Sequence, residues 1–236
     1  MDLGLKDKLI VVGGGAGGIG RVVCKTLLAE GAEVIIADVA NGDVDLSNQT
    51  GTQEFFQTLR KSHEKLSGYC SLVYGGGGEN SFLDASPHEI ESVLQDTLLA
   101  AIYPIQEAVR WMKETGGGQI VVVSSINSML GLNEFAYDVA KGALNRIAPD
   151  IATGCGKYGV RATTLCLGTV CGTPSWKGRE EDIIRIASAI PDGQVTMAKE
   201  VANTIAFLLS HHAAILNGST IIADRGWSLK PPFKSQ

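Results

Sequence analysis

Tyr137 and Lys141 lie four residues apart in an alanine-rich stretch that favours a helix. Positions i and i+4 share one face of a helix, so the phenol and the ammonium group point the same way. Such a pair can move protons, provided that the cation lowers the pKa of the tyrosine from about 10. The alternative is a surface tyrosine above a solvated lysine, since the same spacing arises by chance.

The charge of Lys141 can lower the pKa of Tyr137 by the amount that proton transfer near neutral pH requires. To be ionised near neutral pH, the phenol of Tyr137 must lose roughly two to three pKa units, about 3–4 kcal/mol. A cation about 4 Å away supplies about that much at an effective dielectric constant near 20. We therefore expect Lys141 to lower the pKa of Tyr137, which then acts as an acid or base at a substrate oxygen.

A glycine-rich segment, Gly13–Gly20, follows the apolar run Lys8–Val12 and precedes a stretch of helical periodicity. Small residues let the chain turn tightly and let a pyrophosphate approach the backbone, and the helix that follows supplies free N–H groups. A flexible turn without a ligand is the alternative. The residues that we expect at the phosphate groups are Gly14, Gly17, Gly18 and Ile19.

Asp38 ends a second β-type run, Glu33–Asp38, about twenty residues after the glycine-rich segment. A carboxylate at this place can accept hydrogen bonds from two ribose hydroxyls and repels a 2′-phosphate. The sequence therefore favours NAD over NADP as the cofactor. An aspartate that merely begins a turn is the alternative.

Apolar runs alternate with helical periodicity along the whole chain, and their centres are almost wholly apolar. This pattern predicts an α/β fold: one Rossmann-type, doubly wound parallel sheet of about seven strands with helices on both faces. The stretch from Asp38 to Asp45 is too short for a crossover helix, so we expect the helix after the second strand to be missing. The third strand is then a stub or is reached by a bare loop. Helices are predicted over Thr52–Leu66, Pro87–Glu114 (bent near Pro104) and Lys199–Ser210, and Pro149 is expected to end or kink the helix of Tyr137.

The composition bounds the function. The chain has 236 residues, 44% of them hydrophobic and 19% charged, which suits a single domain over residues 1–236. The net charge of −5 argues against a broad basic surface for nucleic acid or anionic lipid. The first residues resemble neither a signal peptide nor a membrane span. Five scattered cysteines indicate reduced thiols in a cytoplasmic protein and no metal site.

With “GGGAGGIG”, “AD”, “SS”, “YDVAK” and “LGTV” in this order, the chain resembles the short-chain dehydrogenase/reductase family from Leu5 to about Leu229. The family pattern TGxxxGIG is met except that Gly13 replaces threonine, and YxxxK is Tyr137 with Lys141. The family's NNAG lies over “YGGG”, ending at Gly77, and keeps only its last glycine.

The resemblance implies an NAD-dependent enzyme that transfers a hydride between nicotinamide and a secondary alcohol or ketone. Its catalytic serine falls on Ser125, which would orient the substrate oxygen; Ser124 is the alternative if the register slips, and Ser128 is a weaker one. Lys141 could also bind the nicotinamide ribose. The further cofactor residues that the resemblance implies are Asp45, Leu46, Gly75 and Gly76 beside the adenosine, and Gly168 and Val170 over the nicotinamide.

Three departures from the family pattern motivate another hypothesis. Thr97, beside Asp96, stands where the family usually has an asparagine that helps to hold a water in the proton relay. “YGGG” replaces NNAG, and “DRG” at Asp224–Gly226 replaces the family's terminal DGG. The alternative function is therefore a non-catalytic nucleotide-binding regulator or interaction protein on the same fold.

The resemblance also implies a substrate loop at about residues 173–195, and a homodimer or homotetramer. Trp176 of the loop, with Met129 and Leu130 near the active serine, suits a compact, partly apolar alcohol or ketone. Arg179 would suit a substrate carboxylate, or else it belongs to a solvated helix start.

Overall fold

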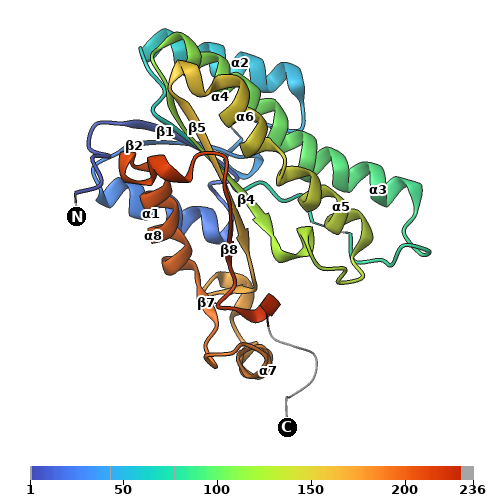
Figure 1. Ribbon diagram of the computed structural model, residues 1–236. Coiled ribbons are helices and arrows are strands. Elements are labelled where there is room, and N and C mark those ends of the chain that lie inside the picture. Colours follow the sequence, from blue (N-terminus) through green and yellow to red (C-terminus); the bar gives the residue numbers. More distant parts are fainter. Residues whose placement is uncertain (1, 43, 77, 230–236) are drawn as a thin grey trace.

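Six parallel strands form the central sheet of the computed structural model, which describes residues 2–42, 44–76 and 78–229 (Figure 1). The strand order is β2-β1-β3-β4-β5-β8 and every pairing in it is parallel. This confirms the predicted doubly wound sheet, with six strands in place of about seven. The strands are β1 (Leu9–Gly13), β2 (Glu33–Ala37), β3 (Gly68–Ser71), β4 (Gly118–Ser125), β5 (Val160–Leu167) and β8 (Thr220–Ala223).

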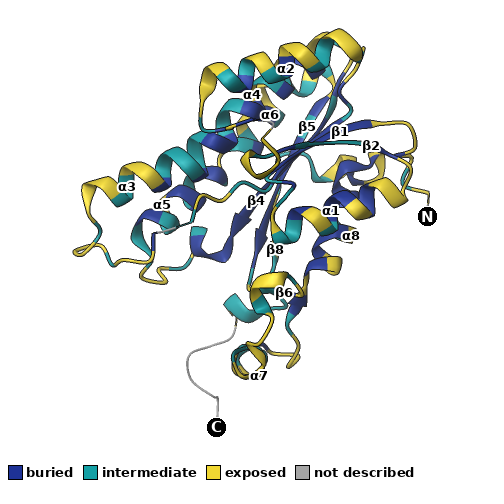
Figure 2. Cartoon of the chain, turned by 180° about the vertical axis from the view of Figure 1, so that it is seen from behind, coloured by how far each residue is buried: buried dark blue, intermediate teal, exposed yellow. Residues whose placement is uncertain are grey.

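Helices cover both faces of the sheet and leave its centre buried (Figure 2). Side chains alternate between the faces: Ile120 and Val122 of β4 belong to one apolar cluster, Val121 and Val123 to the other. The first cluster is covered by α2 (Gln49–Ser62), α4 (Ala100–Glu114) and α6 (Ile147–Cys155), the second by α1 (Gly18–Ala29) and α8 (Ala198–Leu209).

The crossover after β2 is the reason for the lower strand count. Only a 3₁₀ turn, Val39–Asn41, lies in the described residues between β2 and α2. The expected absence of a helix holds for this short stretch alone, because α2 connects β2 to β3. The described residues of the stretch form no strand, and Leu46 packs into the core without pairing with the sheet. So short a connection cannot cross over to a further parallel strand. The chain instead passes directly into α2, which is capped by Asn48.

The long helix predicted over Pro87–Glu114 is interrupted at a different place from the one expected. It consists of α3 (Pro87–Val93), a π-helical turn (Leu94–Leu99) and α4, and the irregular turn precedes Pro104. A proline lacks the N–H of a regular helix and crowds the carbonyl four residues earlier, so hydrogen bonding changes in the turn before it. As a result, α3 packs on α5 (Phe135–Leu144) while α4 packs on the sheet.

Helix α6 and the segment after β5 complete the fold. Pro149 lies in the first turn of α6, which begins after α5 has ended at Leu144, so the helix breaks near this proline as predicted. The segment after β5 projects from the sheet (Figure 1). It contains β6 (Val170–Cys171), a 3₁₀ turn (Pro174–Trp176), α7 (Glu180–Ala189) and β7 (Thr196–Met197).

Gly20 sets how closely α1 approaches the end of β1, and its replacement tests that contact. A Cβ at Gly20 would lie 2.3 Å from the carbonyl oxygen of Gly14, whereas one at Gly17 would lie 3.3 Å from it. We expect Gly20→Ala to lower the free energy of unfolding by about 2–3 kcal/mol, because neither backbone segment can yield. Gly17→Ala, the matched control, should change it by less than about 1 kcal/mol. Urea denaturation of both variants makes the comparison, and equal effects would contradict it.

Candidate active site

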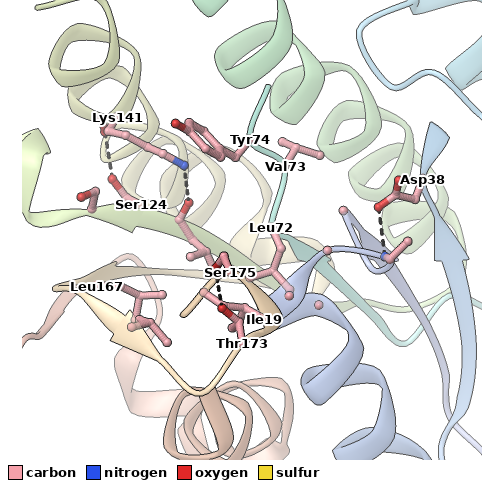
Figure 3. Close-up of a pocket in the computed structure, with 18 of the residues that line it drawn as sticks. Ile19, Asp38, Leu72, Val73, Tyr74, Ser124, Lys141, Leu167, Thr173 and Ser175 are labelled. Atoms are coloured by element: carbon pink, nitrogen blue, oxygen red, sulfur yellow. Dashed lines mark hydrogen bonds between the residues drawn. The ribbon is translucent and has the colours of Figure 1, made fainter. Parts of the chain in front are cut away.

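A cleft of two adjoining cavities lies at the carboxyl ends of the strands, and Figure 3 shows residues that line one of them. The larger, about 530 Å³, reaches from the glycine-rich turn after β1 to Tyr137 and Lys141 on α5. The smaller, about 360 Å³, shares Gly14 and Asp38 with it. The cleft is therefore bipartite, and the glycine-rich turn lies at the junction of its two parts.

Most of the residues singled out in the sequence line this cleft. Those in the larger cavity are Gly14, Gly17, Gly18, Ile19, Asp38, Ser125, Tyr137, Lys141, Gly168 and Val170. Those in the smaller cavity are Gly14, Asp38, Asp45, Leu46 and Gly75. Gly76 lines neither of them, and Gly77 lies outside the described residues. The lining residues that sequence reasoning missed include Leu72 and Val73, which no local motif distinguishes, whereas Thr173 and Ser175 fall within the expected substrate loop.

The glycines are required by close backbone contacts around the cleft. Gly14 has φ +75°, and a Cβ there would lie 2.8 Å from the Leu72 carbonyl at the end of β3. A Cβ at Gly18 would lie 2.8 Å from the side chain of Thr173, so the segment after β5 rests on the start of α1. A Cβ at Gly75 would lie 2.1 Å from that of Asp96. The unusual “YGGG” thus has a steric cause in its first glycine.

Asp38 joins β2 to the glycine-rich turn (Figure 3). One carboxylate oxygen accepts a hydrogen bond from the backbone N–H of Ala16 at 3.0 Å, the other from Ala40 at 2.9 Å. The aspartate therefore begins a turn and borders the cleft at the same time, so the two interpretations of the sequence are compatible. Each oxygen keeps a further lone pair with which it can accept a ribose hydroxyl.

Ser125 is held by Asn127, which lies two residues further along the chain. The Ser125 hydroxyl donates to Asn127 Oδ1 at 2.9 Å, and the Asn127 backbone N–H donates back to Ser125 Oγ at 3.3 Å. The Asn127 amide in turn donates to Glu134 at 3.0 Å and to Asp138 at 2.8 Å. Two carboxylates at the start of α5 thus fix the position of the serine.

The other two serines serve the backbone. Ser124 Oγ donates to the carbonyl of Lys141 at 3.0 Å, and Ser128 Oγ donates to the carbonyl of Ser125 at 2.5 Å. Both hydroxyls therefore support β4 and the turn after it. Of the three, Ser125 is the one whose partner is an exchangeable side-chain amide oxygen, which favours it as the residue that meets a ligand.

Lys141 is buried, and its ammonium group is directed at the backbone (Figure 3). Nζ donates to the carbonyl oxygen of Val123 at 3.4 Å and lies 5.5 Å from the centroid of the Tyr137 ring. Burial lowers the pKa of Lys141 to about 8. Near neutral pH the group is therefore cationic, but it loses its charge over a modest rise in pH.

The expectation that Lys141 lowers the pKa of Tyr137 is wrong for this structure. Burial raises the pKa of Tyr137 to about 12, because it disfavours the phenolate. The Ser125 hydroxyl lowers this pKa, while Tyr74 and the carboxylates of Glu134 and Asp138 raise it. Desolvation outweighs these contacts, so Tyr137 carries its proton at neutral pH.

Thr97 lies in the π-helical turn and is fully buried. Its hydroxyl has no hydrogen-bond partner among the residues that the structure describes. The neighbouring Asp96 lines the smaller cavity, whereas Thr97 lines neither part of the cleft. The hydroxyl is therefore available for a partner but is not positioned at the cavity wall.

The segment after β5 closes one side of the larger cavity. The Trp176 indole N–H donates to the carbonyl of Val170 at 2.7 Å, so this carbonyl is engaged within the segment. Arg179 stacks on Trp176 at 4.7 Å and pairs with Asp182 at 2.9 Å. Arg179 thus belongs to a paired helix start, as the alternative interpretation had it.

The buried Lys141 predicts a pH-dependent stability. Its pKa in the folded state, about 8, lies below the unfolded value near 10.5, so the folded protein releases the proton first as the pH rises. Relative to Lys141→Met, the wild type should gain about 3 kcal/mol of unfolding free energy between about pH 7.5 and 10.5. Denaturation of both proteins across this range measures the gain. Lys25→Met, at an exposed position, controls for loss of a lysine, and a constant difference would contradict the burial of a charge.

Sequence comparison agrees with the geometry. Residues 14–228 match the profile of the family described as “Enoyl-(Acyl carrier protein) reductase”. An acetoacetyl-CoA reductase of Synechocystis sp. is 30% identical over 89% of this chain and 91% of its own length. A 7alpha-hydroxysteroid dehydrogenase of Bacteroides fragilis is 28% identical over 96% of each chain.

Solved structures share the fold. The ligand-free aldohexose dehydrogenase of Thermoplasma acidophilum superposes with a TM-score of 0.89, at 22% identity, over 99% of this chain and 98% of its own. None of the described helices is long and apolar enough to cross a membrane. The matched profile spans most of the chain. The two relatives, a reductase and a dehydrogenase, are matched over nearly their whole length. The chain therefore belongs to the short-chain dehydrogenase/reductase family and is an oxidoreductase.

Proposed function

We propose that this chain is an NAD-dependent oxidoreductase that transfers a hydride between nicotinamide and a secondary alcohol or ketone, with Tyr137 as the acid/base. The observation that carries the proposal is the meeting of Ser125, Tyr137 and Lys141 in one cavity that continues to the glycine-rich turn. A hydride acceptor and a proton-transfer group must face the same substrate carbon and oxygen, and this cavity supports both.

The bipartite cleft fits a dinucleotide. The pyrophosphate would lie at the junction, against Gly14, Gly17, Gly18 and Ile19, where the absence of side chains admits it and the start of α1 favours its charge. Asp45, Leu46, Gly75 and the adjoining Gly76 would meet the adenosine, and Gly168 and Val170 the nicotinamide. The cofactor supplies the hydride or accepts it. Asp38 favours NAD, because a 2′-phosphate would face its carboxylate.

The residues of the cavity divide the work at the substrate oxygen. Tyr137, protonated at neutral pH, is in the form that donates a proton to a carbonyl oxygen. Ser125 exchanges its hydrogen bond to Asn127 for one to the same oxygen, which orients the substrate. Alcohol oxidation requires the phenolate instead, and Lys141 is the cation on the same wall of the cavity that would favour it.

The remaining predictions extend this proposal. The chain would act as one dinucleotide-binding domain over residues 1–236, in the cytoplasm and as a homodimer or homotetramer. Residues 173–195 would form the substrate loop, since Thr173, Ser175 and Trp176 already line the larger cavity. Trp176 and the exposed Met129 suit a compact, partly apolar alcohol or ketone.

A titration with NADH and NADPH, followed by nicotinamide fluorescence, tests the cofactor. We expect NADH to bind at least about tenfold more tightly, the factor that roughly 1.4 kcal/mol of repulsion at Asp38 produces. Asp38→Asn keeps the size of the side chain and removes its charge, so it should abolish most of this preference. Tighter binding of NADPH would overturn the role of Asp38, and binding of neither nucleotide would overturn the function.

Tyr137→Phe separates an enzyme from the non-catalytic alternative. Loss of the phenol hydroxyl should lower kcat at least about 10²-fold, the usual contribution of a positioned acid/base, and leave the affinity for NADH within about twofold. Turnover of a panel of secondary alcohols and ketones provides the measurement. Tyr103→Phe, on α4 and outside the cleft, is the matched control. Equal turnover by wild type and Tyr137→Phe would contradict the proposed role.

A further inference from the structure

A cavity of about 420 Å³ lies at the amino ends of the strands, opposite the candidate active site. It is called the basal cavity here, and its lining includes Lys8, Lys65, Gln119, Arg161 and Gly116–Gly118. Gln119 is the second residue of β4 and Ser125 the last. At 3.3 Å per residue the basal cavity is roughly 20 Å from the candidate active site, so it is a separate feature.

The strand register explains why this cavity forms. Gly68 of β3 pairs with Gln119, and Gln119 pairs with Arg161 of β5, so the three residues make one row across the sheet. A Cβ at Gly68 would lie 3.1 Å from Leu209, the last residue of α8. The helix layer thus ends at this row. Beyond it, the side chains of Gln119 and Arg161 are bordered by turns in place of a helix.

The lining is positively charged. Lys8, Lys65 and Arg161 contribute three cations, and no aspartate or glutamate of the described chain lines the cavity. None of the three forms an ion pair with a described residue. Burial lowers the pKa of Arg161, as expected for a partly desolvated cation without a counter-charge. The carboxyl end of α8 offers only about half a negative charge.

Gln119 is the second, independent indication of a ligand. It is 2% exposed, and neither its Oε1 nor its Nε2 has a hydrogen-bond partner among the described residues. One guanidinium nitrogen of Arg161 is likewise buried without a partner. An unpaired buried polar group destabilises a fold, and the next residues of β4 are apolar, so they offer Gln119 no side-chain partner. Such a cost is offset when a ligand supplies both an acceptor and a donor.

We propose that the basal cavity is a binding site for a small organic phosphate. The phosphate oxygens would accept hydrogen bonds from Arg161, Lys8 and Lys65, and from the amide Nε2 of Gln119. The Oε1 of Gln119 would accept a hydroxyl of the organic part. The site does not depend on the proposed oxidoreductase reaction, because it shares no residue with the cleft.

NMR of glycine-labelled protein tests the proposal, because glycines mark both ends of the sheet. Titration with glycerol 2-phosphate should give saturable shifts of the Gly116, Gly117 and Gly118 amide signals, whereas glycerol should give none. Shifts confined to Gly14 and Gly18 would place the phosphate in the cleft and overturn the proposal. Absence of saturable shifts at Gly116–Gly118 would also overturn it.

Charge variants identify the contacts. Arg161→Gln should weaken binding of glycerol 2-phosphate at least about tenfold, as loss of a charged hydrogen bond does. Lys65→Gln, at an exposed position, should also weaken it and keeps the test valid if the Arg161 variant does not fold. Lys25→Gln removes the same charge from α1, outside the cavity, and should leave the affinity within about twofold. Equal affinity in the wild type, Arg161→Gln and Lys65→Gln would contradict the proposal.

Gln119→Leu distinguishes a ligand contact from a packing residue. Leucine keeps most of the volume and removes the unpaired amide, so thermal unfolding of the free protein should shift to higher temperature. Binding of glycerol 2-phosphate should weaken in the same variant. Unchanged affinity would show that the amide does not face the ligand and would overturn the assignment of Gln119.

Discussion

The structure depends on close contacts between backbone segments at the turn between β1 and α1. Gly20 lies against the carbonyl of Gly14, and Gly14 lies against the carbonyl of Leu72 at the end of β3. These contacts leave no room for side chains, so the start of α1 and the ends of three strands converge on one point, to which Asp38 also bonds. The two cavities meet there. A ligand that spans them must therefore present its narrowest, most charged part to the turn.

Burial governs the other wall of the cleft. Desolvation shifts the pKa of Tyr137 upward and that of Lys141 downward, so near neutral pH the phenol is neutral and the lysine keeps its charge only up to about pH 8. Their proximity alone does not produce an ion pair, since the ammonium group donates to Val123. The site thus holds neutral hydroxyls on Ser125 and Tyr137 beside the cationic Lys141, and Glu134 and Asp138 act on Ser125 through Asn127. A ligand that brings positive charge to this wall favours the phenolate of Tyr137.

The fold and the position of the cleft could be predicted from the sequence, because apolar runs and glycine spacing are properties of short continuous segments. The strands, the glycine-rich turn and the placement of Tyr137 beside Lys141 are of this kind. What the sequence could not give depends on residues that meet only in space. The bond from Ser125 to Asn127 and the direction of the Lys141 ammonium are side-chain choices, and the raised pKa of Tyr137 is a property of burial. In the sequence Gln119 is only the polar residue ahead of an apolar run, and its unpaired amide becomes apparent only where α8 ends.

The π-helical turn Leu94–Leu99 has a consequence for how this chain can tolerate change. Each helical residue advances the side chains by about 100°, and a π turn holds about one residue more than an α turn. The extra residue directs α3 toward α5, where Val93 meets Ala136 and Ala140, while α4 stays on the sheet. A single-residue deletion here would restore regular helical hydrogen bonds and yet turn α3 away from the helix of Tyr137 and Lys141. The irregular turn therefore fixes which side of α3 faces α5. A change in the number of residues in this helix should be selected against more strongly than a substitution.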